Sequence, residues 1–557
     1  MGDRSKEASP HNKGSAGRPW RQFVVASALI FLTACAIEEE PQRGTIGFVE
    51  GFIGGVATDE PRAALIGRDI LSAGGYAADA ATAVYFALSV TMPSQAGLGG
   101  GGVCVVRNAV DQATKTLDFL ARPPRQVPAG ASRPSAIPGN PRGFFALHSK
   151  FGRLRWEELV GPAEALARFG SPVSRAFAAD LAQVERALLA EAPSRRIFGH
   201  SSGKRVLREG ETMTQIELAA VLGRLRREGP GAFYGGTMTR NFIEAVADAG
   251  GALQAEDLRA YRPVWRETIA VPFGDLTAHF ASPPGAAGGV GAGMWRMLSI
   301  DDRYKAADES EKPHLLAESA MRAYADRGQW LQPDGSSSLA PADLASEDRA
   351  ARQMANYSAE RHVPAGQLTP PPVERLENPF ATSFVVFDRF GSAVACALTM
   401  NNLFGTGRFA KGTGVLLAAY PDGAAGRGPT SLGPMIVVNE LVQRMYFAAA
   451  SSGGVAAPTS LINVAARTML AEEPLETAMQ AKRIHHEGVP DITFFENGIT
   501  DAAQKALLGR GHRLARTPTL GRVNAAHCPD GIPQRATKCS IFADVRPRGY
   551  GLAVSAD

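Results

Sequence analysis

The chain has 557 residues, of which 45% are hydrophobic and 20% charged, an ordinary composition for a globular protein with a large core. The formal net charge is +4, from 59 basic and 55 acidic residues, and no run of five or six like charges occurs. This balance lacks the basic patches that bind phosphate backbones, so we expect no nucleic-acid partner.

The N-terminal segment has the pattern of an export signal. Arg18 and Arg21 precede an apolar run at residues 23–32, which is too short to span a bilayer, since that takes roughly 20 residues. The run leads into Leu-Thr-Ala-Cys at residues 32–35, which resembles a bacterial lipobox, where the cysteine is acylated and becomes the mature N-terminus. An ordinary signal peptide with an incidental cysteine is the alternative.

We therefore predict a lipoprotein signal peptide over residues 1–34, a lipid anchor at Cys35 and a polar tether over residues 35–45. The protein is then expected at the periplasmic face of a membrane, where the anchor makes the membrane itself a partner. Ala36 follows the cysteine in place of the Asp that commonly retains lipoproteins in the inner membrane, which favours the outer membrane.

Four further cysteines remain after the anchor. Cys104 and Cys396 stand in apolar, strand-like runs and are predicted to be small core residues. Cys528 and Cys539 lie in a loop-rich tail and are candidates for a disulfide in an oxidising compartment.

The first half of the chain begins with helical patterns. Residues 59–75 have helical spacing with acids first and a Gly pair last, and residues 77–90 are apolar nearly all round, which predicts a buried helix. A short buried strand is predicted at residues 103–106, after the glycines 97–102. These glycines match a dinucleotide-loop pattern, but the order is helix, glycines, strand, so we predict close chain packing there.

Strand patterns dominate after residue 369. Residues 301–365 are mostly helical, and Thr-Pro-Pro-Pro at 369–372 predicts an exposed linker. The later predicted elements are a β-hairpin at 384–388 and 393–399, strands at 435–438 and 445–449, and a helix at 460–470. Helices and strands in this order predict a layered α/β sandwich.

A pair of histidines, His485 and His486, raises the question of a metal site. Adjacent side chains diverge on a strand or helix, and no second ligand pair at metal spacing is visible in the sequence. We predict structural histidines here and no metal or organic cofactor.

Several stretches, in order and at matching spacing, resemble the γ-glutamyltransferase (glutathione hydrolase) family. They are residues 74–81 and 98–102 (its "GGNAVDAA … GGGG" signature), 282–289 (its "PPPSSGG"), 401–407 and 452–454. The resemblance implies an N-terminal-nucleophile (Ntn) hydrolase fold, an αββα four-layer α/β sandwich. It also implies a large-subunit-like region at 46–380 and a small-subunit-like region at 381–557, interleaved in one unit.

Members of this family cut themselves before a Thr that then becomes the nucleophile, with its freed α-amino group as base. When Asp388 and Gly391 of the predicted hairpin are aligned with the family motif, Ala381 takes the nucleophile position. Alanine has no heteroatom for either step. Thr382 replaces it only if the strand slips by one residue, and such a slip reverses which face each side chain occupies.

The resemblance also assigns the other site residues. Thr399, with the oxyanion glycines Gly453 and Gly454, joins Thr382 as a candidate catalytic group. Asn401, Thr430 and Ser431 correspond to substrate-binding positions of the family. Structural roles in the hairpin and loops are the alternative for all of these residues. The family's Arg that clamps the glutamyl carboxylate is replaced by Leu120.

Three functions remain open from the sequence, and the third is a working γ-glutamyltransferase whose segment ends are locally rearranged. The first is a degenerate family member with weak or no γ-glutamyl transfer, which binds a small γ-glutamyl or other amide or peptide ligand in the old cleft. The second is an active periplasmic amide hydrolase of changed specificity that uses Thr382 as N-terminal nucleophile after autocleavage. Loss of the nucleophile and the clamp together favours the first.

Overall fold

The computed structural model describes residues 52–556 apart from 424–425, 429–430, 535–537 and 547–550. The predicted signal peptide, the tether and Cys35 therefore lie outside the described residues, as does Thr430. Within the part of the chain that the structure describes, no helix is both long and apolar enough to cross a membrane.

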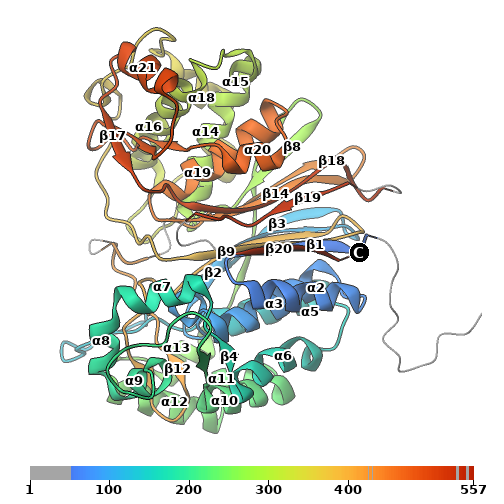
Figure 1. The fold of residues 1–557 in the computed structure, drawn as a ribbon, viewed down its shortest axis with the longest axis vertical. Helices are drawn as coiled ribbons and strands as arrows, with labels where there is room; N and C mark the ends of the chain where they lie inside the picture. The colour runs from blue at the N-terminus through green and yellow to red at the C-terminus, as the bar shows by residue number, and fades with distance from the viewer. Residues whose placement is uncertain (1–51, 424–425, 429–430, 535–537, 547–550, 557) are drawn as a thin grey trace, which may run out of the picture. The chain divides into compact units, whose positions relative to one another are not determined.

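Two antiparallel sheets lie face to face at the centre, with helices on both outer sides (Figure 1). The first sheet, in spatial order, contains β20 (Leu552–Ala556), β1 (Gly54–Thr58), β9 (Thr382–Asp388), β10 (Ala393–Thr399), β2 (Gly101–Asn108), β3 (Ala113–Phe119) and β6 (Val264–Glu267). The second contains β19 (Ser540–Phe542), β18 (Arg522–Ile532), β14 (Arg444–Ser452), β13 (Met435–Asn439), β8 (Leu276–Phe280) and β7 (Ile269–Phe273).

The helices form two outer layers (Figure 1). The layer on the first sheet includes α2 (Pro61–Ser72), α3 (Ala77–Thr91), α5 (Asn140–Phe151), α6 (Trp156–Phe169), α7 (Arg175–Gln183), α8 (Glu185–Ala190), α9 (Ala192–Phe198), α10 (Ile216–Glu228) and α12 (Thr237–Asp248). The layer on the second includes α14 (Ala286–Ser299), α16 (Lys312–Trp330), α18 (Glu347–Met354), α19 (Ala456–Ala465), α20 (Leu475–Gln480) and α21 (Asp501–Gly509). The predicted αββα sandwich is confirmed.

The hairpin β9–β10 is the centre of the first sheet because β9 pairs with β1 and β10 pairs with β2. Side chains of β9 alternate between two apolar clusters. Val385 and Phe387 face the cluster between the sheets, whereas Phe384 and Val386 face the helices. A strand buried on both faces needs a continuous apolar run, which is why the sequence 384–387 has no polar alternation.

Local signals set the helix starts beside this hairpin. Glu60 precedes α2 and its side chain accepts a hydrogen bond from the Ala63 N–H at 2.9 Å, and Pro61 opens the helix. At the start of α3, the Ala77 N–H donates to the buried carboxylate of Asp388 at 2.9 Å. The turn of the β9–β10 hairpin thus also fixes the buried helix below it.

The two helices predicted at 59–75 and 77–90 are α2 and α3, and the predicted strands fall within β2, β9, β10, β13 and β14. The helix predicted at 460–470 begins earlier, as α19, and ends in a π-helical turn at Ala466–Leu470.

The prediction for Cys104 and Cys396 was incomplete. Both are buried in the core, but they form a disulfide, because the antiparallel register of β2 and β10 places them directly opposite one another. The second pair, Cys528 and Cys539, is also bonded, as expected for that tail.

Candidate active site at the start of strand β9

The position before β9 is occupied by a buried alanine. β9 pairs with β10 without a shift from Thr382, opposite Leu398, to Phe387, opposite Ala393, so the hairpin has no bulge near its start. The Ala381 side chain lies in the apolar cluster between the sheets, together with Leu120. The position that the resemblance assigns to the nucleophile therefore holds a buried methyl group.

The carbonyl before Ala381 keeps two hydrogen-bond donors. Thr399 Oγ1 donates to the Phe380 carbonyl oxygen at 2.9 Å, and Asn378 Nδ2 donates to the same oxygen at 3.0 Å. Asn401 supports Thr399, since its backbone N–H donates to Thr399 Oγ1 at 3.0 Å. Donors on a carbonyl oxygen stabilise the negative charge that develops there during attack. The Phe380 carbonyl thus accepts two hydrogen bonds, while the side chain of Ala381 next to it has no hydroxyl.

Thr382 points to the other face of the sheet and has a polar environment of its own. Its Oγ1 donates to Asp59 Oδ2 at 2.9 Å, and Asn524 Nδ2 donates to the other carboxylate oxygen at 3.0 Å. The Arg522 guanidinium donates to the Ala381 carbonyl oxygen at 2.6 Å and lies 3.8 Å from the Asp59 carboxylate. The 381–382 peptide bond is thus surrounded by the Thr382 hydroxyl, the Asp59 carboxylate and the Arg522 guanidinium, and the last of these contacts the carbonyl of that bond.

Sequence reasoning missed four groups of this site: Asp59, Asn378, Arg522 and Asn524. Asp59 was taken as part of a helix start, and its place directly after the buried strand β1 was the available signal. Arg522 and Asn524 are two residues apart on β18, so they lie on the same face of that strand. The sequence patterns did not predict this strand.

The predicted oxyanion and substrate residues lie around the same segment. Gly453 and Gly454 follow β14 with positive φ angles of 128° and 64°. A methyl group on Gly454 would lie 3.1 Å from Pro379 Cα, so the segment before Ala381 packs directly on Gly454, whereas Gly453 packs on Gly521. Ser431 Oγ donates to the Asn378 carbonyl oxygen at 3.3 Å.

Asn401 has a structural position in this arrangement. It has a positive φ of 60°, and its side chain donates to the Ala419 carbonyl at 3.0 Å and to the Ala121 carbonyl at 3.4 Å. Its amide thereby ties the segment after β10 to the loop after β3.

The stretch where the resemblance expects a glutamyl clamp holds Leu120, followed by Arg122. Leu120 is buried among apolar side chains. Arg122 donates to the buried carboxylate of Asp118 at 2.7 Å, and Arg266 donates to the same carboxylate oxygen at 3.0 Å. Arg122 is therefore held by Asp118.

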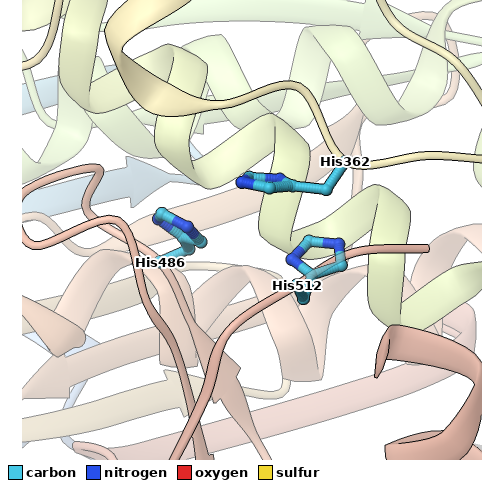
Figure 2. A group of neighbouring side chains, drawn as sticks. All are labelled: His362, His486 and His512. Atoms are coloured by element: carbon cyan, nitrogen blue, oxygen red, sulfur yellow. The ribbon is translucent and has the colours of Figure 1, made fainter. Parts of the chain in front are cut away.

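The structure brings three histidines near His486, which the sequence did not predict. His362, His486 and His512 lie side by side (Figure 2), and His314 contacts His512 with 2.7 Å between the ring nitrogens. His485 points elsewhere, to Thr459 Oγ1 at 3.0 Å, so the two adjacent histidines diverge as expected.

The hydrogen bonds of this cluster fix where its protons lie. The Gly488 N–H donates to His486 Nδ1 at 3.0 Å, so Nε2 of that ring carries the proton and donates to Asp491 Oδ1 at 3.1 Å. His362 lies between two carboxylates, 2.6 Å from Glu318 and 3.0 Å from Asp491, which raise its pKa.

The ring protons of His314 and His512 are assigned from their hydrogen-bond partners in the same way. The Ser358 carbonyl can only accept, so His314 Nε2 donates to it at 2.8 Å and His314 Nδ1 accepts from His512. Burial lowers the pKa of His314 and lowers that of His512 to about 3, so both are neutral. A metal ion would have to displace these protons, and in His486 the fixed backbone donor opposes that exchange.

Comparison with known proteins agrees with the resemblance. A family sequence model described as Gamma-glutamyltranspeptidase matches residues 63–551. The chain is 28% identical to the glutathione hydrolase proenzyme of Escherichia coli strain K12, over 86% of this chain and 89% of that protein. It is 29% identical to the Acylase ACY 1 proenzyme of Pseudomonas sp. strain SE83, over 89% and 92%.

Among solved structures, the cephalosporin acylase from Bacillus halodurans has a TM-score of 0.76 at 21% identity, covering 93% of this chain and 98% of that one. This similarity identifies the fold as that of the Ntn hydrolases. Since the family model spans most of the chain, the protein belongs to the γ-glutamyltransferase (gamma-glutamyltranspeptidase) family.

Proposed function

We propose that the protein is a γ-glutamyltransferase-family member that remains one uncleaved chain and does not transfer γ-glutamyl groups. The observation that carries this proposal is Ala381 at the unshifted start of β9, directly after a carbonyl that retains both of its donors. Without a hydroxyl at that position, neither an ester with the preceding residue nor an acyl-enzyme can form.

The substrate side supports the same proposal. Leu120 contributes no charge where a glutamyl carboxylate would bind, and Arg122 is engaged by Asp118. A charge-assisted pair with a carboxylate contributes about 1.5–3 kcal/mol, so its loss weakens glutamyl binding tenfold or more. We therefore propose that the protein binds a small amide or peptide ligand without transferring a γ-glutamyl group from it.

A second function is favoured by the groups around Thr382. Asp59 is placed to take the Thr382 hydroxyl proton, and the Arg522 guanidinium is placed to stabilise negative charge on the Ala381 oxygen. Attack of Oγ1 on the Ala381 carbonyl carbon would form an ester and break the Ala381 C–Thr382 N bond, and the hydroxyl proton would pass through Asp59 to the released Thr382 nitrogen. Water would then release an Ala381 carboxylate and a free Thr382 amine, the nucleophile of an amide hydrolase.

Measuring the mass and the N-termini of the wild-type chain, after purification and long incubation, distinguishes these two functions. We expect one intact chain. Samples must be reduced first, because the Cys104–Cys396 disulfide links residues on either side of position 381 and would hold two fragments together.

A fragment beginning at Thr382 would overturn the uncleaved proposal and establish the second function. Thr382→Val is the matched control, since valine keeps the shape of threonine without the hydroxyl. It should abolish such cleavage, and amide substrates would then be screened on the cleaved wild type.

We also propose that the protein is exported and lipid-anchored through Cys35. The lipobox-like sequence before that residue supports this proposal, as do the two disulfides, because disulfides persist in oxidising compartments. Mass spectrometry of the mature N-terminus tests it, and an unmodified Cys35 or an uncleaved leader would contradict it.

A further inference from the structure

Three hairpin turns at one end of the sandwich share the same construction. In each, an Asn or Asp side chain accepts a hydrogen bond from the N–H two residues ahead, at 2.9 Å: Asn108 from Val110, Asp388 from Phe390 and Asn439 from Leu441. Such Asx turns normally carry polar residues at their tips. Here each one presents an apolar residue.

The apolar side chains at the tips of these turns are exposed on the surface. Val110 is 81% exposed, Leu441 85% and Val442 54%, while Phe390 is 40% exposed and packs edge-on against Tyr76. We name Val110, Phe390, Leu441 and Val442 the tip patch. Clustered apolar side chains on a surface indicate a binding surface, whereas single ones do not.

Two contacts hold the three turns next to one another. The Ala109 N–H donates to Ser392 Oγ at 3.1 Å, which joins the β2–β3 turn to the β9–β10 turn within the first sheet. The guanidinium of Arg107, on β2, donates to Gln443 Oε1, which joins that sheet to the β13–β14 turn of the second sheet. The tip patch therefore spans the ends of both sheets.

The N-terminal segment of the chain enters the fold at this same end. The Ile53 carbonyl accepts a hydrogen bond from the Arg389 N–H at 2.8 Å, and the Phe52 ring lies 6.0 Å from the Phe387 ring. In Figure 1 this is the end at which the C-terminus is marked, since Ala556 and Asp388 both pair with Gly54. Residues 36–51 thus connect the lipobox cysteine to the tip-patch end.

We propose that the tip patch rests on the phospholipid surface of the membrane that carries the lipid anchor. The proposal rests on the anchoring of Cys35 proposed above. A lipid surface fits three small apolar protrusions at the point where the anchored chain emerges, because each can enter the interfacial region without opening the core. Ala381 lies at the other end of β9, roughly 20 Å away, so the candidate active site lies at the end away from the membrane.

The test uses the mature, lipidated protein, which begins at Cys35, in phospholipid vesicles. Leu441→Cys and, as matched control, Leu508→Cys are labelled with an environment-sensitive fluorophore, with spin-labelled lipids as quenchers. Leu508 is 56% exposed on α21, at the top of Figure 1 and away from the tip patch. The other cysteines are acylated or bonded in disulfides, so the introduced thiol alone reacts. Unchanged melting temperatures establish that both variants fold.

We expect lipid quenching at position 441 to be about threefold or more stronger than at position 508. Equal quenching on a chain shown by mass to be acylated would overturn the proposal. So would an apolar environment at 441 without lipid quenching, which would indicate that a second copy covers the patch. If the chain carries no acyl group, the anchor proposal fails separately. Flotation of the protein with vesicles then tests whether the tip patch binds lipid. Flotation of the wild type that Leu441→Asp abolishes would support the proposal, and a wild type that does not float would overturn it.

Discussion

At the scale of single residues, Ala381 has no hydroxyl, although two donors lie on the carbonyl that precedes it. Thr399 and Asn378 both donate to the Phe380 carbonyl, although no side chain at position 381 can attack it. These donors need no help from Ala381 to hold their positions, since Asn378 also donates to Thr399 Oγ1 at 3.0 Å. The arrangement is therefore expected to act again when a hydroxyl is supplied.

Ala381→Thr should restore self-cleavage, from no detectable product to most of the chain. The new hydroxyl lies next to the polarised Phe380 carbonyl, and the product is a fragment that begins at the introduced threonine. Reduced intact mass and N-terminal sequencing measure the result. Ala381→Val is the control, because it adds the same bulk to the apolar cluster without a hydroxyl, and it should stay whole. A folded Ala381→Thr variant that stays whole would show that the remaining donors are structural.

The sequence resemblance pointed to residues in the hairpin and the glycine-rich loops that the structure brings close together. Thr399 and Gly454 contact the segment before β9, and Asn401 contacts Thr399. It did not predict Arg522, whose contact with Ala381 spans 141 residues and depends on how the two sheets stack. Such contacts leave no periodic pattern, so no window of the sequence contains them.

At the scale of elements, the sequence patterns predicted several strands but not which strands pair with one another. The β9–β10 hairpin follows from adjacent apolar runs and a turn, whereas its insertion between β1 and β2 depends on pairings over hundreds of residues. The same limit explains the incomplete prediction for Cys104 and Cys396. Only the register of β2 against β10 places them opposite each other.

Removing the disulfide that closes the longer loop should destabilise the fold more, although the effect grows only slowly with loop length. The Cys104–Cys396 bond spans 292 residues and the Cys528–Cys539 bond spans 11. Restricting the unfolded chain stabilises a protein by about 3 kcal/mol for a short loop and up to about 5 kcal/mol for a long one. Urea unfolding of the two double Cys→Ala variants measures the difference. Equal losses, or a larger loss for the short loop, would contradict this expectation.

At the scale of the whole molecule, buried neutral histidines couple folding to pH. His485 is buried, and desolvation, with a smaller effect from His486 and Arg327, lowers its pKa from 6.5 to about 3. Between pH 6.5 and 3 the unfolded chain binds a proton on this ring and the folded chain does not. The free energy of unfolding therefore falls with decreasing pH in that window, by about 1.4 kcal/mol per pH unit for each such group. Burial acts on the pKa of His527 in the same direction, to about 4.

His485→Gln should reduce this acid sensitivity by about 1 kcal/mol per pH unit between about pH 6 and 4, because glutamine takes up no proton in either state. Urea unfolding at a series of pH values from neutral down through this window compares the slopes of the variant and the wild type. His200→Gln is the control, since that ring lies in a loop and is partly exposed. Other titrating groups contribute equally to all three proteins, so the difference in slope isolates His485. A glutamine variant with the slope of the wild type would mean that the ring accepts a proton within the fold, through local opening of the strand β15 (Ile484–His485) that carries it.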